Sequence, residues 1–188
     1  MNLPNKLTML RMALIPLFLV FMFTSIPFHY LWALAVFAAA SFTDLLDGKI
    51  ARKYGLITDF GKLMDPLADK LLVMSAMVAF VELRWTPAVV VIVILAREFL
   101  VTSIRLIAAG KGTVLAADKW GKFKTVSQMI WICFMLLTKW LLESFAIPDF
   151  YVVLFNGAQW ALTAAVVYLT LYSGVNYMRK NWDLFRDA

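Results

Sequence analysis

The chain has 188 residues, of which 63% are hydrophobic and 16% are charged, and its mean hydropathy is +0.80. This composition excludes an ordinary soluble domain and predicts an integral membrane protein. The excess of 18 Lys and Arg over 12 Asp and Glu does not indicate a nucleic-acid-binding protein, because the basic residues are scattered at the predicted helix ends, as membrane topology requires.

Apolar runs separated by Pro, Gly and polar breaks predict an all-α bundle of six transmembrane helices, at residues 5–24, 31–53, 59–83, 87–109, 119–142 and 149–178. No soluble domain remains outside these helices, so we expect residues 1–188 to form a single membrane domain. The loop before the second helix carries His29, which we expect at the surface.

The basic residues also predict the orientation of the bundle. With the N-terminus inside, the Lys and Arg residues at helix ends fall almost entirely at inner ends, and only Arg84 and Lys139 fall at outer ends. We therefore expect both termini in the cytoplasm and a multi-pass protein in the inner (cytoplasmic) membrane.

Four aspartates interrupt the apolar pattern of the second and third helices. Asp44 and Asp47 are three residues apart, and Asp65 and Asp69 are four apart, so each pair projects from one helix face. If the helices form an antiparallel hairpin about Gly55, the two pairs become level with each other at the cytoplasmic side. The sequence therefore predicts one site at which four acids converge.

The cost of burying these acids indicates what the site holds. Each Asp at the centre of a membrane helix costs roughly 2.5 to 3.5 kcal/mol, and packed like charges repel. A cation would offset both terms, and carboxylate ligands without His or Cys favour Mg²⁺, Mn²⁺ or Ca²⁺ over zinc. The alternative is a set of salt bridges to the neighbouring basic residues Lys49, Arg52, Lys62 and Lys70.

Two further groups of polar residues lie within or at the ends of the apolar runs. Arg97 and Glu98 occupy the middle of the fourth helix, where ionisable residues are functional candidates or else pair as structural glue. Lys122, Lys124 and Thr125 begin the fifth helix. A phosphate group would meet ammonium groups and unpaired helix N–H donors there, although plain anchoring at the membrane surface explains the same residues.

Asn5, Thr8 and Arg11 recur every three residues at the inner end of the first helix. They either line the cavity or cap the helix and hold it at the interface.

These residues carry a resemblance to a known family. The chain resembles the CDP-alcohol phosphatidyltransferases in a signature that runs Asp44-x2-Asp47-Gly48-x2-Ala51-Arg52-x8-Gly61-x3-Asp65-x3-Asp69. Within that family, four other stretches resemble the members that use glycerol 3-phosphate: Leu-Pro-Asn-x-Leu-Thr-x-x-Arg, Asp-Pro-x-Ala-Asp-Lys, Ala96-Arg97-Glu98 and Gly121-Lys122-x-Lys124-Thr125.

The resemblance implies transfer of the phosphatidyl group from CDP-diacylglycerol to glycerol 3-phosphate, with release of CMP, in anionic phospholipid synthesis. It implies two Mg²⁺ or Mn²⁺ ions and a general base, Asp69, which is also one of the expected metal ligands Asp44, Asp47, Asp65 and Asp69. The residues expected to bind CDP-diacylglycerol are Asn5, Thr8, Asp44, Gly48, Ala51, Arg52, Thr58 and Gly61. The candidates for the phosphate group of the acceptor are Arg97, Arg105, Lys122 and Lys124, with the two arginines preferred. Members of the family are commonly homodimers, so we expect a homodimer among membrane lipids.

Two alternatives remain open at this point. The first keeps the reaction and changes the acceptor to inositol phosphate, serine or phosphatidylglycerol, although the cationic residues favour a phosphorylated acceptor. The second is a divalent-cation transporter that uses the four acids as its ion site. The acids lie near one side of the membrane instead of along a path, and Arg52 has no evident role in an ion pore.

Overall fold

The computed structural model describes the backbone of residues 3–54, 59–111, 115 and 119–182. It describes the side chains of these residues except 3, 4, 44–54, 59–63, 65, 66 and 69. The described chain is all-α, with six helices: α1 (Leu3–Phe23), α2 (His29–Tyr54), α3 (Asp59–Glu82), α4 (Ala88–Gly110), α5 (Lys119–Ser144) and α6 (Asp149–Lys180). Every helix begins and ends within two residues of its predicted bounds, so the prediction of six helices is confirmed.

Prolines and residues with positive φ lie in the connections between helices, where the sequence predicts breaks. Pro87 and Pro148 each precede a helix in an extended conformation, with φ of −62° and −55°, because the ring fixes φ and is tolerated at a helix start. Phe28 and Arg84 have φ of 61° and 58°, which turns the chain sharply before α2 and after α3.

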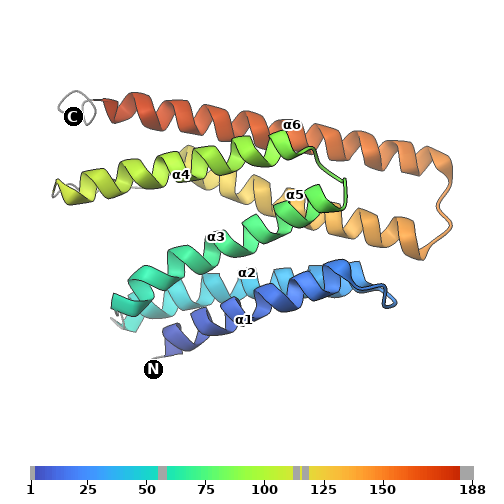
Figure 1. Cartoon of the computed structure of the whole chain (residues 1–188), viewed down its shortest axis with the longest axis horizontal. Helices are drawn as coiled ribbons and strands as arrows, with labels where there is room; N and C mark the ends of the chain where they lie inside the picture. Colours follow the sequence, from blue (N-terminus) through green and yellow to red (C-terminus); the bar gives the residue numbers. More distant parts are fainter. Residues whose placement is uncertain (1–2, 55–58, 112–114, 116–118, 183–188) are drawn as a thin grey trace.

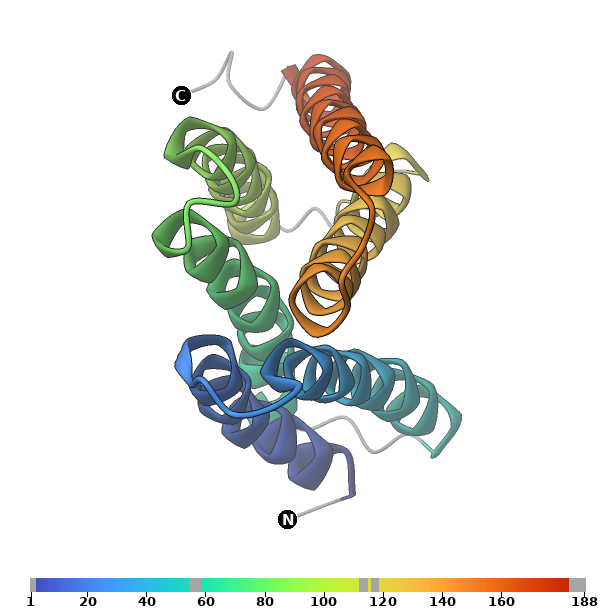
Figure 2. The same cartoon turned by 90° about the vertical axis from the view of Figure 1, so that its right-hand side faces the viewer.

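The six helices form a closed ring. Around the ring the order is α1, α2, α5, α6, α4 and α3, and each helix contacts the next, with α3 returning to α1. Figure 2 shows α3 between α1 and α4 on one side and α5 between α2 and α6 on the other. Additional contacts join α3 to α2 and to α5 across the ring. The helix α3 therefore packs against four of the other five helices.

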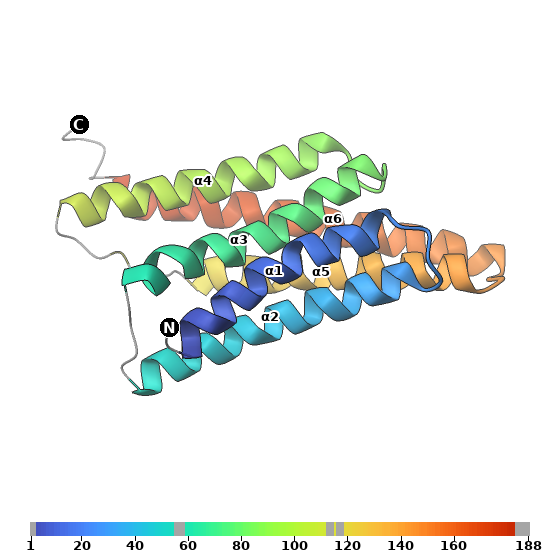
Figure 3. The same ribbon diagram turned by 60° about the horizontal axis from the view of Figure 1, so that its bottom comes forward.

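The start of α1 and the end of α6 lie at the same end of the bundle, which we call the termini end (Figure 1). The ends of α2 and α4 and the starts of α3 and α5 lie there too. The connections α1–α2, α3–α4 and α5–α6 lie at the opposite end, as Figure 3 also shows. Which end faces the cytoplasm stays a prediction from the basic residues.

Aromatic side chains from four helices fill the core. Phe18 of α1 packs against Phe37 of α2 with ring centroids 6.0 Å apart. Phe80 of α3 meets Trp131 of α5 edge to face at 5.7 Å, and all four side chains are fully buried. The outward faces, in contrast, expose apolar side chains such as Val89. A bundle that is apolar inside and outside is the pattern expected in lipid.

Three of the helices, as far as their side chains are described, are long and apolar enough to cross a membrane: α1 from Asn5, α5 and α6. The helix α4 contains Arg97, Glu98 and Arg105 within its length, and α2 and α3 include residues whose side chains are not described. The chain is therefore a multi-pass helical membrane protein. The prediction that all six helices span the membrane is supported for these three.

His29 is buried, so its prediction as a surface residue is wrong. Its Nδ1 lies 3.0 Å from the carbonyl oxygen of Phe21 and its Nε2 lies 3.2 Å from Oε1 of Glu143. The carbonyl groups in the last turn of a helix lack helical donors, and the imidazole supplies one to α1. A single side chain thereby ties α1 and α5 to the start of α2.

A buried hydrogen bond between α5 and α6 yields a stability prediction. The indole Nε1 of Trp131 donates to Oγ1 of Thr163 at 3.0 Å. We expect Thr163→Val to lower the free energy of unfolding by about 1 to 3 kcal/mol, because it leaves a buried N–H without an acceptor. The matched control is Thr170→Val on the same helix, since the buried Oγ1 of Thr170 has no hydrogen-bond partner among the described residues. Thermal unfolding in detergent would measure both, and equal losses would contradict the prediction.

Candidate active site

The residues of the acidic signature lie at the termini end of α2 and α3. The helix α2 carries positions 44, 47, 48, 51 and 52, and α3 carries positions 61, 65 and 69. The two helices run antiparallel and contact each other, as the hairpin prediction requires. The side chains at these positions, and Thr58 altogether, lie outside the described residues. The convergence of the four acids therefore stays a prediction.

The metal site stays a prediction for the same reason. Among the described side chains, no three of the types His, Cys, Asp and Glu gather to hold an ion. The expected ligands Asp44, Asp47, Asp65 and Asp69 are not among those side chains. As a donor set, four carboxylates and no nitrogen or sulfur suit a hard divalent cation such as Mg²⁺ or Mn²⁺.

The polar residues at the start of α1 face the interior of the bundle. Asn5, Thr8 and Arg11 are all buried, on a helix that packs against α2 and α3. A residue that only anchored α1 at the interface would be exposed, so burial favours the interpretation in which these side chains line an interior site. A fully buried guanidinium requires compensating negative charge nearby, and the segments with the acidic signature lie at this same end.

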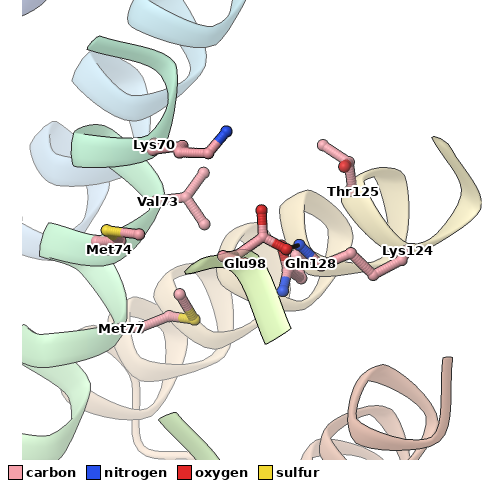
Figure 4. A pocket seen from close by; sticks show the side chains of 8 residues that line it. All are labelled: Lys70, Val73, Met74, Met77, Glu98, Lys124, Thr125 and Gln128. Carbon is pink, nitrogen blue, oxygen red and sulfur yellow. Dashed lines mark hydrogen bonds and ion pairs between the residues drawn. The ribbon is translucent and has the colours of Figure 1, made fainter. Parts of the chain in front are cut away.

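A pocket opens inside the ring between α3, α4 and α5. Figure 4 shows the side chains that line it, which are Lys70, Val73, Met74, Met77, Glu98, Lys124, Thr125 and Gln128. It encloses about 340 Å³ of space between protein atoms, counting the part open to solvent.

The pocket lies along the same side of α3 as positions 65 and 69. Positions 65, 69, 73 and 77 follow one another at intervals of four, so they share one side of the helix. Val73 and Met77 line the pocket, and Asp65 and Asp69 precede them on the same stripe of backbone. A ligand in the pocket would therefore lie next to the acidic segment along α3.

Within the pocket, one carboxylate holds two cations. Nη1 of Arg97 lies 3.0 Å from Oε1 of Glu98, and Nζ of Lys124 donates to the same oxygen. The side chain of Lys124 is 2% exposed and that of Glu98 is 18% exposed. Among the described side chains here, two positive charges against one negative charge leave an excess that Lys70, at the pocket wall, increases. This excess favours an anionic ligand.

Arg97 lies close to two glycines, and the one on α6 makes room for it. A Cβ atom added at Gly174 of α6 would lie 3.0 Å from Cγ of Arg97, and one added at Gly121 of α5 would lie 3.8 Å from its Nη2. The guanidinium therefore reaches Glu98 by passing close to the backbone of α6. The sequence analysis did not identify Gly174, because a glycine in an apolar helix gives no local sign of which side chain it faces.

The sequence analysis also did not identify Gln128. Its side chain is buried and lines the pocket, and its Nε2 has no hydrogen-bond partner among the described residues. A buried, unsatisfied amide donor is costly, and a ligand oxygen would satisfy it. An amide in the middle of an apolar helix was the signal available in the sequence.

The structure separates the four cations expected to bind the acceptor phosphate. Arg97 and Lys124 meet at Glu98. Arg105 instead donates from Nε to the hydroxyl of Tyr177 at 3.2 Å, with its guanidinium carbon 5.5 Å from the ring centroid. Lys122 is exposed, and a separation of two residues from Lys124 places it about 200° around α5.

Comparisons with known proteins agree with the signature. The family model for CDP-alcohol phosphatidyltransferase matches residues 1–172. The chain belongs to this family. It is 44% identical to a CDP-diacylglycerol–glycerol-3-phosphate 3-phosphatidyltransferase of Bacillus subtilis, over 100% of this chain and 98% of that protein.

Two further proteins that are similar to this chain carry related names. A protein of the same name from Pseudomonas fluorescens is 34% identical over 97% of this chain and 91% of its own length. A probable phosphatidylglycerophosphate synthase of Mycobacterium tuberculosis is 37% identical over 95% of this chain and 81% of its own length. The protein is therefore an enzyme of a transferase family, and the transporter alternative loses its basis.

The shared carboxylate yields a prediction about charge balance. Glu98→Gln leaves two buried cations without their common anion, so we expect the free energy of unfolding to fall by about 3 kcal/mol. The double variant Glu98→Gln/Lys124→Gln removes one cation as well and should recover most of that loss. Thermal unfolding of the single and double variants measures the coupling. Losses from Glu98→Gln and Lys124→Gln that simply add in the double variant would show that these two side chains act independently.

Proposed function

We propose that this phosphatidyltransferase transfers the phosphatidyl group of CDP-diacylglycerol to glycerol 3-phosphate, giving phosphatidylglycerol phosphate and CMP. The names of the full-length relatives support this reaction. The observation that carries the choice of acceptor is the pocket beside the acidic segment of α3, where the described side chains have an excess of positive charge.

The pocket discriminates between the acceptors that the signature leaves open. Lys124 and Lys70 line it, and Arg97 adds charge behind Glu98, so a phosphate dianion is favoured over serine. Phosphatidylglycerol carries a single negative charge on its phosphodiester, so the same excess of positive charge favours it less than a phosphate dianion. Inositol phosphate carries the same phosphate group, and the enzymatic test below distinguishes it from glycerol 3-phosphate.

The chemical step needs a base and a neutralised leaving group. Asp69 takes the proton of the acceptor hydroxyl, whose oxygen forms a bond to the phosphorus that carries diacylglycerol. The bond from that phosphorus to the bridging oxygen breaks, and CMP leaves with this oxygen. When bound by Asp44, Asp47, Asp65 and Asp69, Mg²⁺ or Mn²⁺ supplies positive charge to the pyrophosphate.

The remaining signature residues hold the nucleotide in this proposal. Arg52 balances the negative charge of the pyrophosphate, and the small residues Gly48, Ala51 and Gly61 allow it to approach the backbone. Asn5 and Thr8, both buried at the same end of the bundle, contact the nucleotide, together with Thr58.

The reaction also sets the proposed location. The distribution of the basic residues supports a cytoplasmic location for the termini end of the bundle, where glycerol 3-phosphate is dissolved. CDP-diacylglycerol then reaches the site from the inner leaflet of the cytoplasmic membrane. We further propose a homodimer, which light scattering of the purified protein in detergent would test.

An assay of acceptor choice tests the proposed function directly. Purified protein with CDP-diacylglycerol and Mg²⁺ or Mn²⁺ should release CMP with glycerol 3-phosphate, and not with serine or inositol phosphate. EDTA should abolish the release. Asp69→Asn should abolish turnover while the protein stays folded and binds CDP-diacylglycerol, because the proton acceptor is lost and the other three expected metal ligands remain. Release with inositol phosphate instead would keep the mechanism and overturn the acceptor, whereas normal turnover of Asp69→Asn would remove the base.

The contact between Arg97 and α6 yields a prediction about acceptor affinity. We expect Gly174→Ala to raise the KM for glycerol 3-phosphate about tenfold, because the added Cβ displaces Arg97 and small misplacements of binding groups are costly. The KM for CDP-diacylglycerol should stay unchanged.

The matched control for this variant is Gly157→Ala on the same helix, where an added Cβ meets nothing within 4 Å. Both substitutions favour the helical backbone equally. Thermal unfolding of the two variants separates an effect on acceptor binding from a loss of stability caused by the new contact with Arg97. Equal KM values for the two variants would place Arg97 outside the acceptor site.

A further inference from the structure

A second pocket lies at the end of the bundle opposite the termini, where α3 connects to α4. The residues that line it are Val81, Arg84, Trp85, Thr86, Pro87, Ala88 and Trp160. All except Trp160 belong to the end of α3, the connection or the start of α4, and Trp160 comes from α6. The acidic segments lie at the other end of α3 (Figure 1), so this pocket is separate from the site described above.

The start of α4 supplies hydrogen-bond donors to this pocket. Pro87 precedes the helix and provides no side-chain cap. The N–H of Val90 is bonded to the carbonyl of Pro87 at 3.1 Å, whereas the first N–H groups of a helix, here those of Ala88 and Val89, have no helical acceptor. Such an uncapped end carries partial positive charge and favours an anion.

An independent observation comes from Thr86. Its side chain is only 5% exposed and lines the pocket, and its Oγ1 has no hydrogen-bond partner among the described residues. A buried hydroxyl without a partner is unfavourable. A ligand oxygen in the pocket would accept its hydrogen.

Arg84 adds a full positive charge to the same wall. The residue has φ of 58°, a conformation uncommon for a side-chain-bearing residue, and its N–H bonds to the carbonyl of Val81 at 3.0 Å. None of the described carboxylates forms an ion pair with it. The turn that sets its position is fixed further by the N–H of Trp85, which donates to the carbonyl of Phe80 at 2.8 Å.

The aromatic walls indicate that the anion belongs to a lipid. Gln159 of α6 donates from Nε2 to the carbonyl of Trp85 at 3.0 Å, which holds the connection against α6. The neighbouring Trp160 is 56% exposed, and Val89 in the first turn of α4 is 68% exposed. Donors and a cation next to exposed aromatic and aliphatic surface match a phosphate group with acyl chains attached, whereas a free phosphate ion would gain nothing from that surface.

We propose that this pocket binds the phosphate group of a phospholipid from the leaflet opposite the acidic site. Thr86, Arg84 and the N-terminus of α4 hold the phosphate oxygens, and the acyl chains lie along the exposed faces of α4 and α6. The bound lipid joins the α3–α4 connection to α6. This proposal rests on membrane insertion and not on the reaction proposed above.

Lipid binding to the full chain in detergent tests the proposal. Native mass spectrometry of the purified protein, titrated with dioleoylphosphatidylglycerol, gives an apparent dissociation constant, and dioleoylglycerol and inorganic phosphate serve as probes that carry only one half of the ligand. We expect Arg84→Gln to weaken phosphatidylglycerol binding about tenfold and Thr86→Val about fivefold, as loss of a charged and a neutral hydrogen bond implies. Thr86→Ser keeps the hydroxyl and should bind as the unaltered protein does.

The matched control is Arg179→Gln, which removes an exposed arginine from the termini end of α6. This control should bind phosphatidylglycerol normally, and all the variants should keep their basal turnover, because they lie outside the proposed active site. Unchanged affinity in both Arg84→Gln and Thr86→Val would overturn the proposal. So would binding of dioleoylglycerol as tight as that of phosphatidylglycerol, or inorganic phosphate binding that is lost in the same two variants. The comparison of the three probes on the unaltered protein remains decisive even if a variant fails to fold.

Discussion

The interior of this bundle depends on one carboxylate, that of Glu98, which pairs with two largely buried cations from two helices. A charge inside an apolar bundle is tolerated only when it is paired. Arg97 belongs to α4 and Lys124 to α5, so their common partner connects two helices that are not neighbours in the ring. The pairing keeps positive charge at the pocket wall without the cost of an isolated buried ion.

This constraint extends to the packing of α6. A Cβ at Gly174 would lie 3.0 Å from Cγ of Arg97, so a side chain at that point of α6 would require Arg97 to shift. The ring then closes through α4 and α6 on one side and through α5 and α6 on the other. Arg97 consequently takes part both in the charge pairing at the pocket and in the close packing of α4 against α6.

The two ends of α3 have different chemistry. At the termini end, α3 carries the carboxylates of the family signature, which suit cations and a nucleotide pyrophosphate. At the opposite end it leads into a turn where Arg84, Thr86 and the uncapped start of α4 suit an anion. A helix whose ends meet different groups of the membrane environment can be oriented by lipid contacts at one end while the reaction takes place at the other.

The sequence by itself determined the helices, the family and the acidic segments. Apolar runs ended by Pro and Gly define helix bounds locally, which is why every bound was predicted to within two residues, and the signature is a fixed spacing along the chain. The tertiary structure decided which cations meet. Lys124 and Arg97 share Glu98, whereas Arg105 pairs with Tyr177 and Lys122 faces outward, and His29 is buried against Glu143. The physical reason is that a helix side chain can point in any direction around its axis, and only the packing of the other helices determines what lies there.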